Sequence, residues 1–166
     1  KDAENIGEMV PSNLIRRFLE GRKANRPATV PGLGLVMQRL ENPLLRKRVG
    51  LGPKQSGLLV VGLEWGSSSF GHVRVGDAIL AIDGHRVANN GTVQYGGGEA
   101  QPPRGGAGKS FRTGSEVLLG DHFVGDVIMV EVLRKGRILE LEIELLPYVS
   151  LVPKSQYDTA PTYFVY

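Results

Sequence analysis

The fold of this chain is decided by the stretch Val73-Arg74-Val75-Gly76-Asp77-Ala78-Ile79-Leu80-Ala81-Ile82-Asp83-Gly84. Its continuous apolar run, Ala78–Ile82, is typical of a strand that is buried on both faces. Asp83-Gly84 follows as one of the dipeptides that two-residue hairpin turns prefer. Both aspartates stand beside a glycine at a strand end, where Asp usually accepts hydrogen bonds from local backbone N–H groups. The stretch therefore predicts a central strand that ends in a tight turn.

Two further strands and a short helix are predicted before this stretch. The glycine turn Gly32-Leu33-Gly34-Leu35 leads into a strand at Val36-Met37-Gln38-Arg39. Asn42-Pro43 predicts an N-cap and the first residue of a short helix that ends at Val49, because Pro is favoured at the first helical position. The apolar run in residues 57–63 predicts a second buried strand.

A glycine-rich segment separates the central stretch from a second group of elements. Residues 89–114 contain eight glycines and the pair Pro102-Pro103, a composition that buries too little apolar surface to hold one conformation. We therefore expect a mobile loop there. A helix is predicted at 115–123, and two strands, Val127–Leu133 and Ile138–Leu146, follow it. In the second strand apolar residues alternate with Glu, which predicts one buried and one solvated face.

The two ends of the chain carry their own patterns. Four apolar residues form one stripe at helical spacing within residues 11–20, and Gly21 with the polar residues after it is expected to end that helix. We place a boundary between structural units at 21–30. The last residues, 148–166, hold five of the eleven aromatic residues, so we expect this tail either to pack on the domain or to begin another unit.

Composition narrows the class of protein. A chain of 166 residues, 41% of them hydrophobic, suits one domain with appendages and is not wholly disordered. No stretch reaches the roughly 20 apolar residues of a membrane-spanning helix, so no membrane span is expected. The absence of Cys removes disulfides and thiolate metal sites. Residues 1–50 hold ten bases and five acids, but short basic clusters without interleaved aromatics are a weak signal, and we expect no binding of nucleic acid.

No constellation of side chains predicts catalysis or a bound metal. His72, His85 and His122 are scattered and lack the spacing of metal ligands, so no metal site is expected. Ser67-Ser68-Ser69 is interpreted as a turn or helix cap, because no sequence feature identifies a base that would activate a nucleophile. The segment 105–110 lacks the glycine spacing of a phosphate-binding loop. No cofactor is expected.

In this order the elements resemble a PDZ domain, in the circularly permuted form of the HtrA/Deg serine proteases. The resemblance covers residues 31–146 apart from the glycine-rich insertion. It rests on Gly32-Leu33-Gly34-Leu35, Ser56-Gly57-Leu58-Leu59-Val60, the stretch from Val73 to Gly84, and Val132-Leu133-Arg134-Lys135-Gly136. It implies a mostly β fold (all-β or α+β), a PDZ-like open barrel of five or six strands capped by two helices.

The flanking residues are similar to other parts of the plant-type Deg proteases. Residues 1–27 resemble the end of the protease domain and its linker helix, and residues 148–166 resemble the lead-in to a second PDZ domain. The PDZ domain itself would then be 28–147, with its insertion at 89–114. The catalytic His, Asp and Gly-Asn-Ser-Gly-Gly segment of the family are not in this sequence. The resemblance implies a non-catalytic module of a serine endopeptidase, a hydrolase of protein quality control. The compartment stays open, because the family occurs in the bacterial periplasm and in eukaryotic organelles or the nucleus.

The expected site is a groove for an extended peptide. A carboxylate needs several converging N–H donors, which the turn Gly32-Leu33-Gly34-Leu35 could supply without obstruction by side chains. The strand Val36-Met37-Gln38-Arg39 would pair with the peptide, and the helix at 115–123 would form the opposite wall. An apolar pocket would accept the last side chain of the peptide. The residues predicted for that pocket and wall are Leu33, Leu35, Val117, Leu118 and His122.

Gly-Leu-Gly-Leu by itself is also what a glycine-tolerant turn before any strand looks like, so two functions stay open. In the first, the domain binds C-termini or extended segments of other proteins and positions substrate or regulates the protease. In the second, it assembles the protease oligomer through its helices and aromatic tail, while the glycine-rich loop closes the groove. The expected partners are peptides or unfolded protein substrates, the protease domain and other subunits of the parent oligomer.

Overall fold

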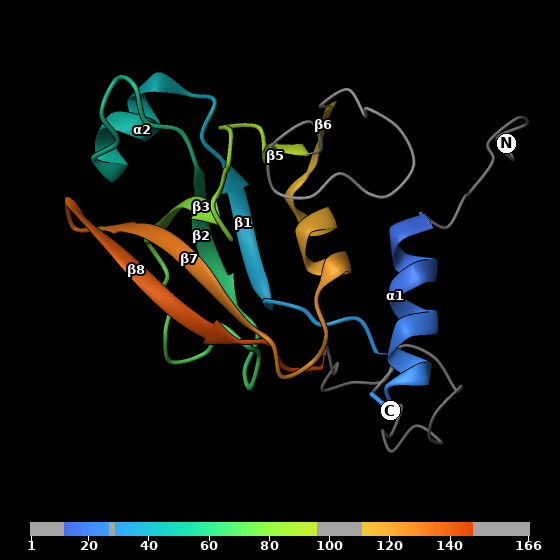
Figure 1. Ribbon diagram of the computed structural model, residues 1–166. Coiled ribbons are helices and arrows are strands. Elements are labelled where there is room, and N and C mark those ends of the chain that lie inside the picture. The colour runs from blue at the N-terminus through green and yellow to red at the C-terminus, as the bar shows by residue number, and fades with distance from the viewer. Residues whose placement is uncertain (1–11, 27–28, 96–110, 148–166) are drawn as a thin grey trace, which may run out of the picture.

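The computed structural model describes residues 12–26, 29–95 and 111–147 (Figure 1). The expectations for residues 1–11, for the centre of the glycine-rich segment at 96–110 and for the tail at 148–166 lie outside the described residues and stay predictions. In chain order the elements are α1 (Ser12–Lys23), β1 (Leu35–Arg39), α2 (Pro43–Val49), β2 (Leu58–Leu63), β3 (Ala78–Ile82), β4 (His85–Arg86), β5 (Thr92–Tyr95), β6 (Phe111–Gly114), the 3-10 helix η1 (Ser115–Asp121), β7 (Val127–Arg134) and β8 (Arg137–Glu144).

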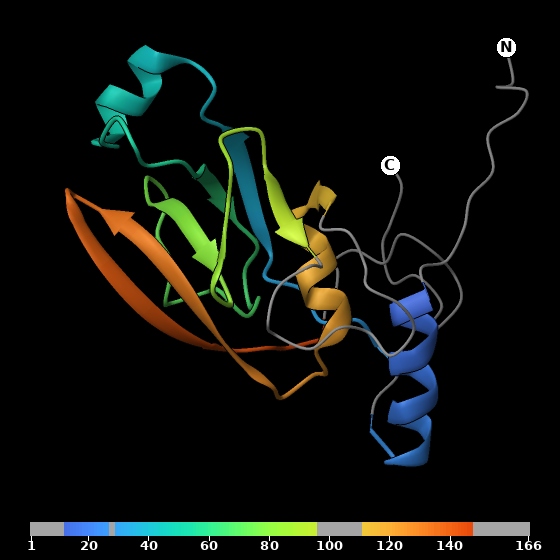
Figure 2. The same cartoon turned by 45° about the horizontal axis from the view of Figure 1, so that its top comes forward.

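Most of the described strands form one antiparallel sheet. Its order is β1-β2-β3-β7-β8, and the short strand β4 pairs with β3 beside this path. β5 and β6 pair separately. Within the described residues β1 and β8 are therefore the two edges, and the sheet is open. The mostly β, PDZ-like fold is confirmed, although the sheet is not closed into a barrel. Figure 1 and Figure 2 show η1 beside β1, and α1 on the far side of η1.

β3 is the centre of the sheet and of the core, as the sequence predicts. Every residue of this strand is buried. The turn Asp83-Gly84 joins it to β4 with φ angles of 48° and 77°, in the left-handed region that this two-residue turn requires. Ile79 and Ile82 belong to the larger hydrophobic cluster, whereas Leu80 belongs to a smaller one, against which α2 packs Leu45. The core therefore lies on both sides of β3.

The capping residues of α2 are those that the sequence predicts. Asn42 Oδ1 accepts a hydrogen bond from the N–H of Leu44 at 2.9 Å, and Pro43 is the first helical residue. Gly50 ends the helix with a φ of 88°, in the left-handed conformation that favours glycine at this position. The signals that start and stop this helix are local, so neighbours in the sequence were sufficient to predict it.

Three predictions about the other elements need correction. The two ends of the predicted loop at 89–114 pair with each other as β5 and β6. The predicted helix at 115–123 is a 3-10 helix that ends at Asp121, and the residue before it, Gly114, has no side chain with which to cap it. β2 is buried on one face only, because it packs against the core with Val60 while Val61 is exposed.

α1 continues past Gly21, where the sequence predicts its end, and stops at Lys23. Gly21 is buried against Phe123, and a Cβ added to it would lie 2.9 Å from Cε1 of that ring. This glycine therefore permits close packing instead of ending the helix. The guanidinium carbons of Arg17 and Arg26 lie 5.6 Å and 4.4 Å from the centroid of the same ring.

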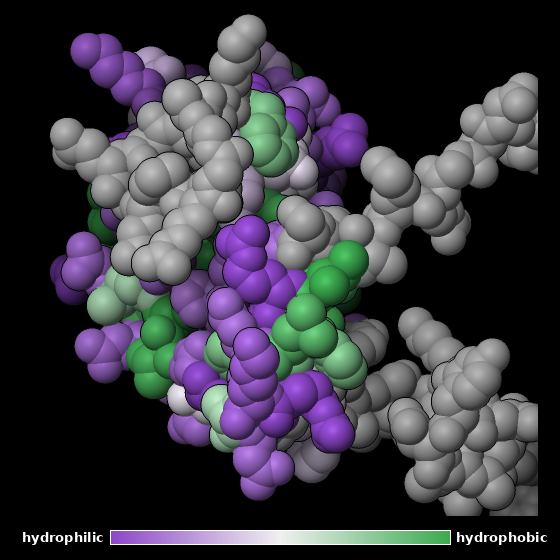
Figure 3. Space-filling model, turned by 45° about the vertical axis from the view of Figure 1, so that its right-hand side comes forward, coloured by the Kyte–Doolittle hydropathy of each residue, from purple (hydrophilic) through white to green (hydrophobic). Residues whose placement is uncertain are grey.

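The apolar stripe predicted on α1 is mostly on the outside of the described structure. Leu14 is half-buried, whereas Ile15, Phe18 and Leu19 are each about half exposed. On the face of the molecule that carries α1, Figure 3 shows apolar side chains lying among hydrophilic ones. The side of α1 that faces the rest of the described structure instead buries the charged side chain of Arg17.

A buried ion pair joins the loop between β2 and β3 (residues 64–77, the β2–β3 loop) to the end of β7. Asp77 is 2% exposed, and its two carboxylate oxygens accept hydrogen bonds from Nε and Nη2 of Arg134 at 2.9 Å and 2.7 Å. Asp77 also accepts from the N–H of Arg74 at 2.8 Å, and Arg134 Nη2 donates to the carbonyl of His72 at 2.8 Å. The hydrogen bond from Asp77 raises the pKa of Arg134 above its ordinary value. The guanidinium of Arg134 thus holds both His72 and Asp77, at the two ends of the last turn of the β2–β3 loop.

Replacing Asp77 by Asn should destabilise the domain strongly, because Arg134 would keep its charge without a counter-ion. Breaking a buried pair in this way typically costs about 3 to 5 kcal/mol of the free energy of unfolding, which urea denaturation measures. Arg134→Met should cost a similar amount, and the double variant should cost less than the sum of the two. Glu140→Gln on the exposed face of β8 is the control and should change stability by less than about 0.5 kcal/mol. Fully additive losses would contradict the pairing.

A second carboxylate holds the segment after η1 to the C-terminal end of α1. Asp126 Oδ1 accepts from Nη2 of Arg26 at 2.7 Å, and its Oδ2 accepts from the N–H of Phe123 at 2.8 Å. Burial alone would raise the pKa of Asp126, but the N–H of Phe123 and the guanidinium of Arg26 outweigh it and hold that pKa below its usual value. Folding therefore favours the ionised form of Asp126.

This lowered pKa makes the contribution of Asp126 dependent on pH. The contribution is fully present above the unfolded pKa of about 4 and is lost as the pH falls through the lower folded pKa. Asp126→Asn should therefore reduce the free energy of unfolding by about 1 kcal/mol at neutral pH, since the pair is partly solvated. The difference between the two proteins should shrink steadily below about pH 4 in urea titrations. A difference that is the same in acid and at neutral pH would contradict this role.

Candidate functional site

The carbonyl groups of the glycine turn at 32–34 are all bonded to the β2–β3 loop. The bonds are Ser68 Oγ to the carbonyl of Gly32 at 2.6 Å, the N–H of Ser69 to that of Leu33 at 3.2 Å, and the N–H of Glu64 to that of Gly34 at 2.9 Å. Ser68 Oγ also accepts from the N–H of Leu146 at 2.8 Å. One side of the turn is therefore satisfied by a neighbouring loop and by the strand end at 146.

Most N–H groups of the same turn, unlike its carbonyls, have no hydrogen-bond partner among the described residues. Gly32 donates to the carbonyl of Leu146 at 3.4 Å, but the N–H groups of Leu33 and Gly34 donate to no acceptor among the described residues. Because Gly34 is bonded to Glu64 across the ladder, the alternation of an antiparallel pair turns the N–H of Leu35 towards the free edge of β1. Consecutive free N–H groups of this kind are the donors that bind an anion.

Gly34 has a conformation and a neighbour that only glycine tolerates. Its φ is +65°, and a Cβ added to it would lie 2.2 Å from Cβ of Ser67 and 2.6 Å from its Oγ. Non-bonded atoms do not approach one another this closely, so a side chain at position 34 would displace the turn or the β2–β3 loop. The glycine that the sequence analysis assigned to the carboxylate turn is thus required by the fold itself.

The predicted pairing strand is an edge strand. β1 pairs with β2 on one side only, with a bulge between Val36 and Met37. Val36, Gln38 and Arg39 are exposed, and Met37 packs against the larger core cluster. The N–H of Leu40 just beyond the strand donates to the carbonyl of Asn89 at 2.9 Å. Over most of its length β1 therefore presents a backbone edge with no partner among the described residues.

The apolar residues predicted for the pocket belong to one hydrophobic cluster. Leu33 and Leu118 are buried in it, and Leu35 and Val117 are partly buried against it. The glycine turn, which directly precedes β1, and η1, which lies beside β1 in Figure 1, therefore pack side chains against the same core. Because Leu35 and Val117 keep part of their surface exposed, an apolar side chain of a ligand has a surface to contact.

His122 is not part of this apolar set. It is the residue that follows η1, and its Nε2 lies 3.2 Å from Oδ2 of Asp83 in the β3–β4 turn. Its Nδ1 lies 3.9 Å from Oδ2 of Asp126. The imidazole is therefore directed at two carboxylates below the end of η1. His122 lies outside the wall because η1 ends at Asp121, one residue before it.

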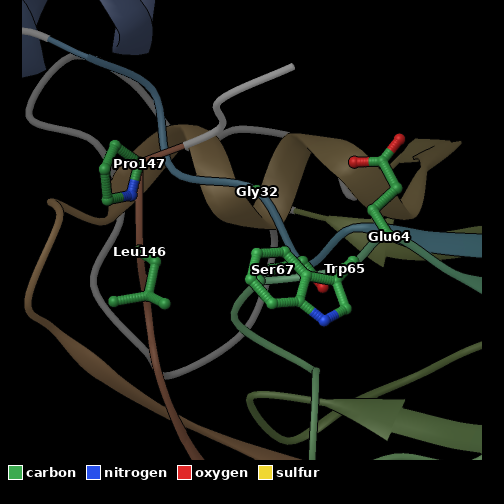
Figure 4. Close-up of a pocket in the computed structure, with 7 residues that line it drawn as sticks. Gly32, Glu64, Trp65, Ser67, Leu146 and Pro147 are labelled. Atoms are coloured by element: carbon green, nitrogen blue, oxygen red, sulfur yellow. The ribbon is translucent and has the colours of Figure 1, made fainter. Parts of the chain in front are cut away.

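A small hollow lies at the other end of the glycine turn. Its volume is about 180 Å³, and Figure 4 shows Leu146 and Pro147 on one side of it and Trp65 and Ser67 on the other. Trp65 is 69% exposed and contacts Phe70 edge to face, with the ring centroids 6.1 Å apart. None of the residues that line this hollow comes from η1, so it is separate from the predicted pocket.

Sequence reasoning missed Ser68, which holds the glycine turn, and Trp65, which lines the separate hollow beside it. The hydroxyl of Ser68 links the carbonyl of Gly32 to the N–H of Leu146, across 36 and 78 positions of the chain. Ser67-Ser68-Ser69 reads as three equivalent hydroxyls in the sequence, and nothing local distinguishes the one that makes these bonds. An exposed Trp in a loop likewise carries no signal of what lies beside it.

Two other classes of site find no support in the described part of the chain. Across residues 12–26, 29–95 and 111–147, no three His, Asp or Glu side chains are placed to hold a metal ion. None of the helices in those ranges is long and apolar enough to cross a membrane. Asp77 and Asp83, which could have been an acid pair, have separate partners in Arg134 and His122.

The sequence of this chain is similar to those of several known proteins. No protein-family model matches the chain. It is 30% identical over 166 residues to protease Do-like 2, chloroplastic, of Arabidopsis thaliana, which covers 99% of this chain and 25% of that protein. It is 29% identical over 170 residues to protease Do-like 4, mitochondrial, of the same organism, covering 99% of this chain and 30% of that protein. The chain thus spans between a quarter and a third of these relatives.

The fold has solved neighbours of the same kind. The HtrA-type protease AlgW with a decapeptide superposes with a TM-score of 0.53 at 20% identity, over 85% of this chain and 36% of that chain. Its S227A variant with a decapeptide gives a TM-score of 0.57 at 20% identity, over 88% and 37%. At this identity the likeness concerns the fold, and the sequence relationship comes from the Do-like proteases. The chain is therefore a relative of the HtrA/Deg (Do-like) proteases over part of their length, and it has the mostly β, PDZ-like fold that its sequence predicts.

Proposed function

We propose that this PDZ domain binds the C-terminal segment of another protein as an added strand. The peptide would pair antiparallel with the free edge of β1, and its carboxylate would accept hydrogen bonds from the N–H groups of Leu33 and Gly34. The observation that carries the proposal is the hydrogen bonding of the glycine turn. Its carbonyls are bonded to the β2–β3 loop, and the N–H groups of Leu33 and Gly34 have no acceptor among the described residues. Strand addition supplies main-chain hydrogen bonds, and a terminal pocket supplies selectivity.

The chemistry around the turn supports an apolar last residue. Leu35 and Val117 are partly exposed beside the buried Leu33 and Leu118, so burial of a ligand side chain there would remove apolar surface from water. Arg39 is exposed at the far end of β1 and favours an acidic residue several positions before the C-terminus. The preferred ligand would therefore be acidic upstream and apolar at its end.

In the parent protein this binding would serve proteolysis. The relatives are proteases, and this chain corresponds to about a quarter to a third of their length. We infer a parent serine endopeptidase in which the domain positions extended or unfolded substrates, or regulates the protease domain and other subunits. The chain itself would cleave nothing. The AlgW protease is solved with a decapeptide, which supports the peptide class of ligand here by analogy.

Titration calorimetry with a mixture of peptides that end in large apolar residues tests the carboxylate. Peptides with a free C-terminus should bind, and the same peptides with an amidated C-terminus should bind at least about tenfold more weakly, because a charge-assisted hydrogen bond is lost. Equal binding of both forms would show that internal segments are the ligands. No binding at high concentration, with sedimentation that depends on concentration, would instead support the assembly function.

Replacing Gly34 by Ala tests the turn. The added Cβ would displace Ser67 or the turn, so peptide affinity should fall at least about tenfold. Gly50→Ala is the matched control, because Gly50 also has a positive φ, +88°, but has no atom within 4 Å of an added Cβ. Gly50→Ala should lose about 1 kcal/mol of stability from the strained backbone, and Gly34→Ala should lose more, because its Cβ also collides with Ser67. Loss of binding in both, or in neither, would refute a specific role of the turn.

A further inference from the structure

The wall of the proposed groove is an element with little stability of its own. η1 is a 3-10 helix of seven residues, and Gly114 gives it no side-chain cap at its start. Such helices are short because their hydrogen bonds are poorly aligned, and isolated short helices are not stable in water. Its one fully buried apolar side chain is Leu118. The position of η1 must therefore depend on contacts with its neighbours.

Three consecutive residues, the last of η1 and the two that follow it, each contact a neighbouring element, and α1 is among the partners of all three. Asp121 Oδ1 accepts from Nδ2 of Asn13 at 3.1 Å, and its Oδ2 accepts from the hydroxyl of Tyr95. Burial and this carboxylate raise the pKa of Tyr95 to about 12, so its hydroxyl stays protonated and continues to donate. The end of η1 is thus tied to the first turn of α1 and to β5.

The other two residues bind the middle and the end of α1. Nη1 of Arg17 donates to the carbonyl of His122 at 2.8 Å. The ring of Phe123 lies against Gly21 and under the guanidinium groups of Arg17 and Arg26. Along its length, α1 therefore contacts the end of η1 at three successive positions, and Figure 2 shows the two helices side by side.

Arg17 is the centre of this contact. It is 4% exposed, and besides the carbonyl of His122 it also donates to the carbonyl of Thr29 at 3.3 Å. A buried guanidinium is costly unless its donors find acceptors, so its position between these carbonyls fixes α1, the segment after α1 and the end of η1 relative to one another. Releasing α1 would expose that charge and leave the His122 carbonyl without this donor.

We propose that α1 positions the wall of the peptide groove through Arg17, so that docking of α1 and binding of peptide are thermodynamically coupled. The coupling rests on the proposed peptide-binding function, whereas the dependence of η1 on α1 does not. When α1 is released, η1 loses the contacts that hold its C-terminal end, and the groove is competent for only a fraction of the time. Apparent affinity falls by that fraction, and by linkage bound peptide must favour docked α1 to the same extent. Arg17 is on this account a positioning residue for the site.

The test compares Arg17→Met with Arg22→Met in the full chain. Both substitutions remove an arginine from α1 and introduce an unbranched apolar side chain, but Arg22 is exposed and its side chain makes no hydrogen bond or ion pair among the described residues. Hydrogen exchange of individual amides is measured by NMR without peptide. In Arg17→Met, exchange should accelerate at least about tenfold in both α1 and η1, while the amides of β7 and β8 are unchanged. Arg22→Met should exchange as the wild-type protein does.

Peptide titration supplies the second readout. Affinity should fall about tenfold in Arg17→Met and stay unchanged in Arg22→Met, and saturating peptide should slow exchange in α1 of the wild-type protein. Phe123→Leu, which removes the aromatic ring but keeps an apolar side chain, should reproduce the effect if Arg17→Met fails to fold. Faster exchange in α1 with unchanged η1, or unchanged affinity for peptide, would overturn the proposal. If the wild-type protein binds no peptide, the proposed function fails, and the exchange of η1 alone decides whether α1 holds it.

Discussion

The buried pair of Asp77 and Arg134 is the interaction on which the rest of the site depends. It joins the end of β7 to the last turn of the β2–β3 loop, and the same guanidinium holds the carbonyl of His72. With this end anchored, the loop can present Glu64, Ser68 and Ser69 as donors to the glycine turn. A carboxylate that contacts no ligand thus determines the shape of a turn that is well placed to bind one.

The glycine turn separates its hydrogen-bonding groups into two sets. Its carbonyls are bonded to the β2–β3 loop, and among the described residues the N–H groups of Leu33 and Gly34 have no acceptor. Free N–H groups bonded to water lose little, whereas a buried and unpaired one would cost about 1 to 3 kcal/mol. A carboxylate that replaces this water makes charge-assisted bonds, which are stronger than neutral ones. The arrangement therefore favours an anion over a neutral group, and it does so with backbone atoms alone.

The sequence predicts best those features that depend on near neighbours. The caps of α2, the continuous burial of β3 and the turn at Asp83-Gly84 all follow from residues a few positions apart. It also predicts that the apolar side chains of the glycine turn and of η1 share one cluster, because spacing and family resemblance agree. It does not predict Ser68, Arg134 or Arg17 as partners, since their acceptors lie 36, 57 and 105 positions away. Gly21 shows the same limit, because a local signal for a helix end is outweighed by packing against Phe123.

The proposed wall of the groove is a 3-10 helix, and this has a physical consequence. A long, capped helix with a large buried face would hold its position whether or not α1 was present, and contacts at its end would change little. η1 packs Leu118 in the core, whereas its C-terminal end is held by Asn13 and Arg17 of α1 and by Phe123 at the junction with α1. An element near the balance point responds to small changes in such contacts, because a shift of 1.4 kcal/mol alters its population about tenfold. The outer face of α1 exposes Ile15, Phe18 and Leu19, so a contact made there could reach the groove through one buried arginine.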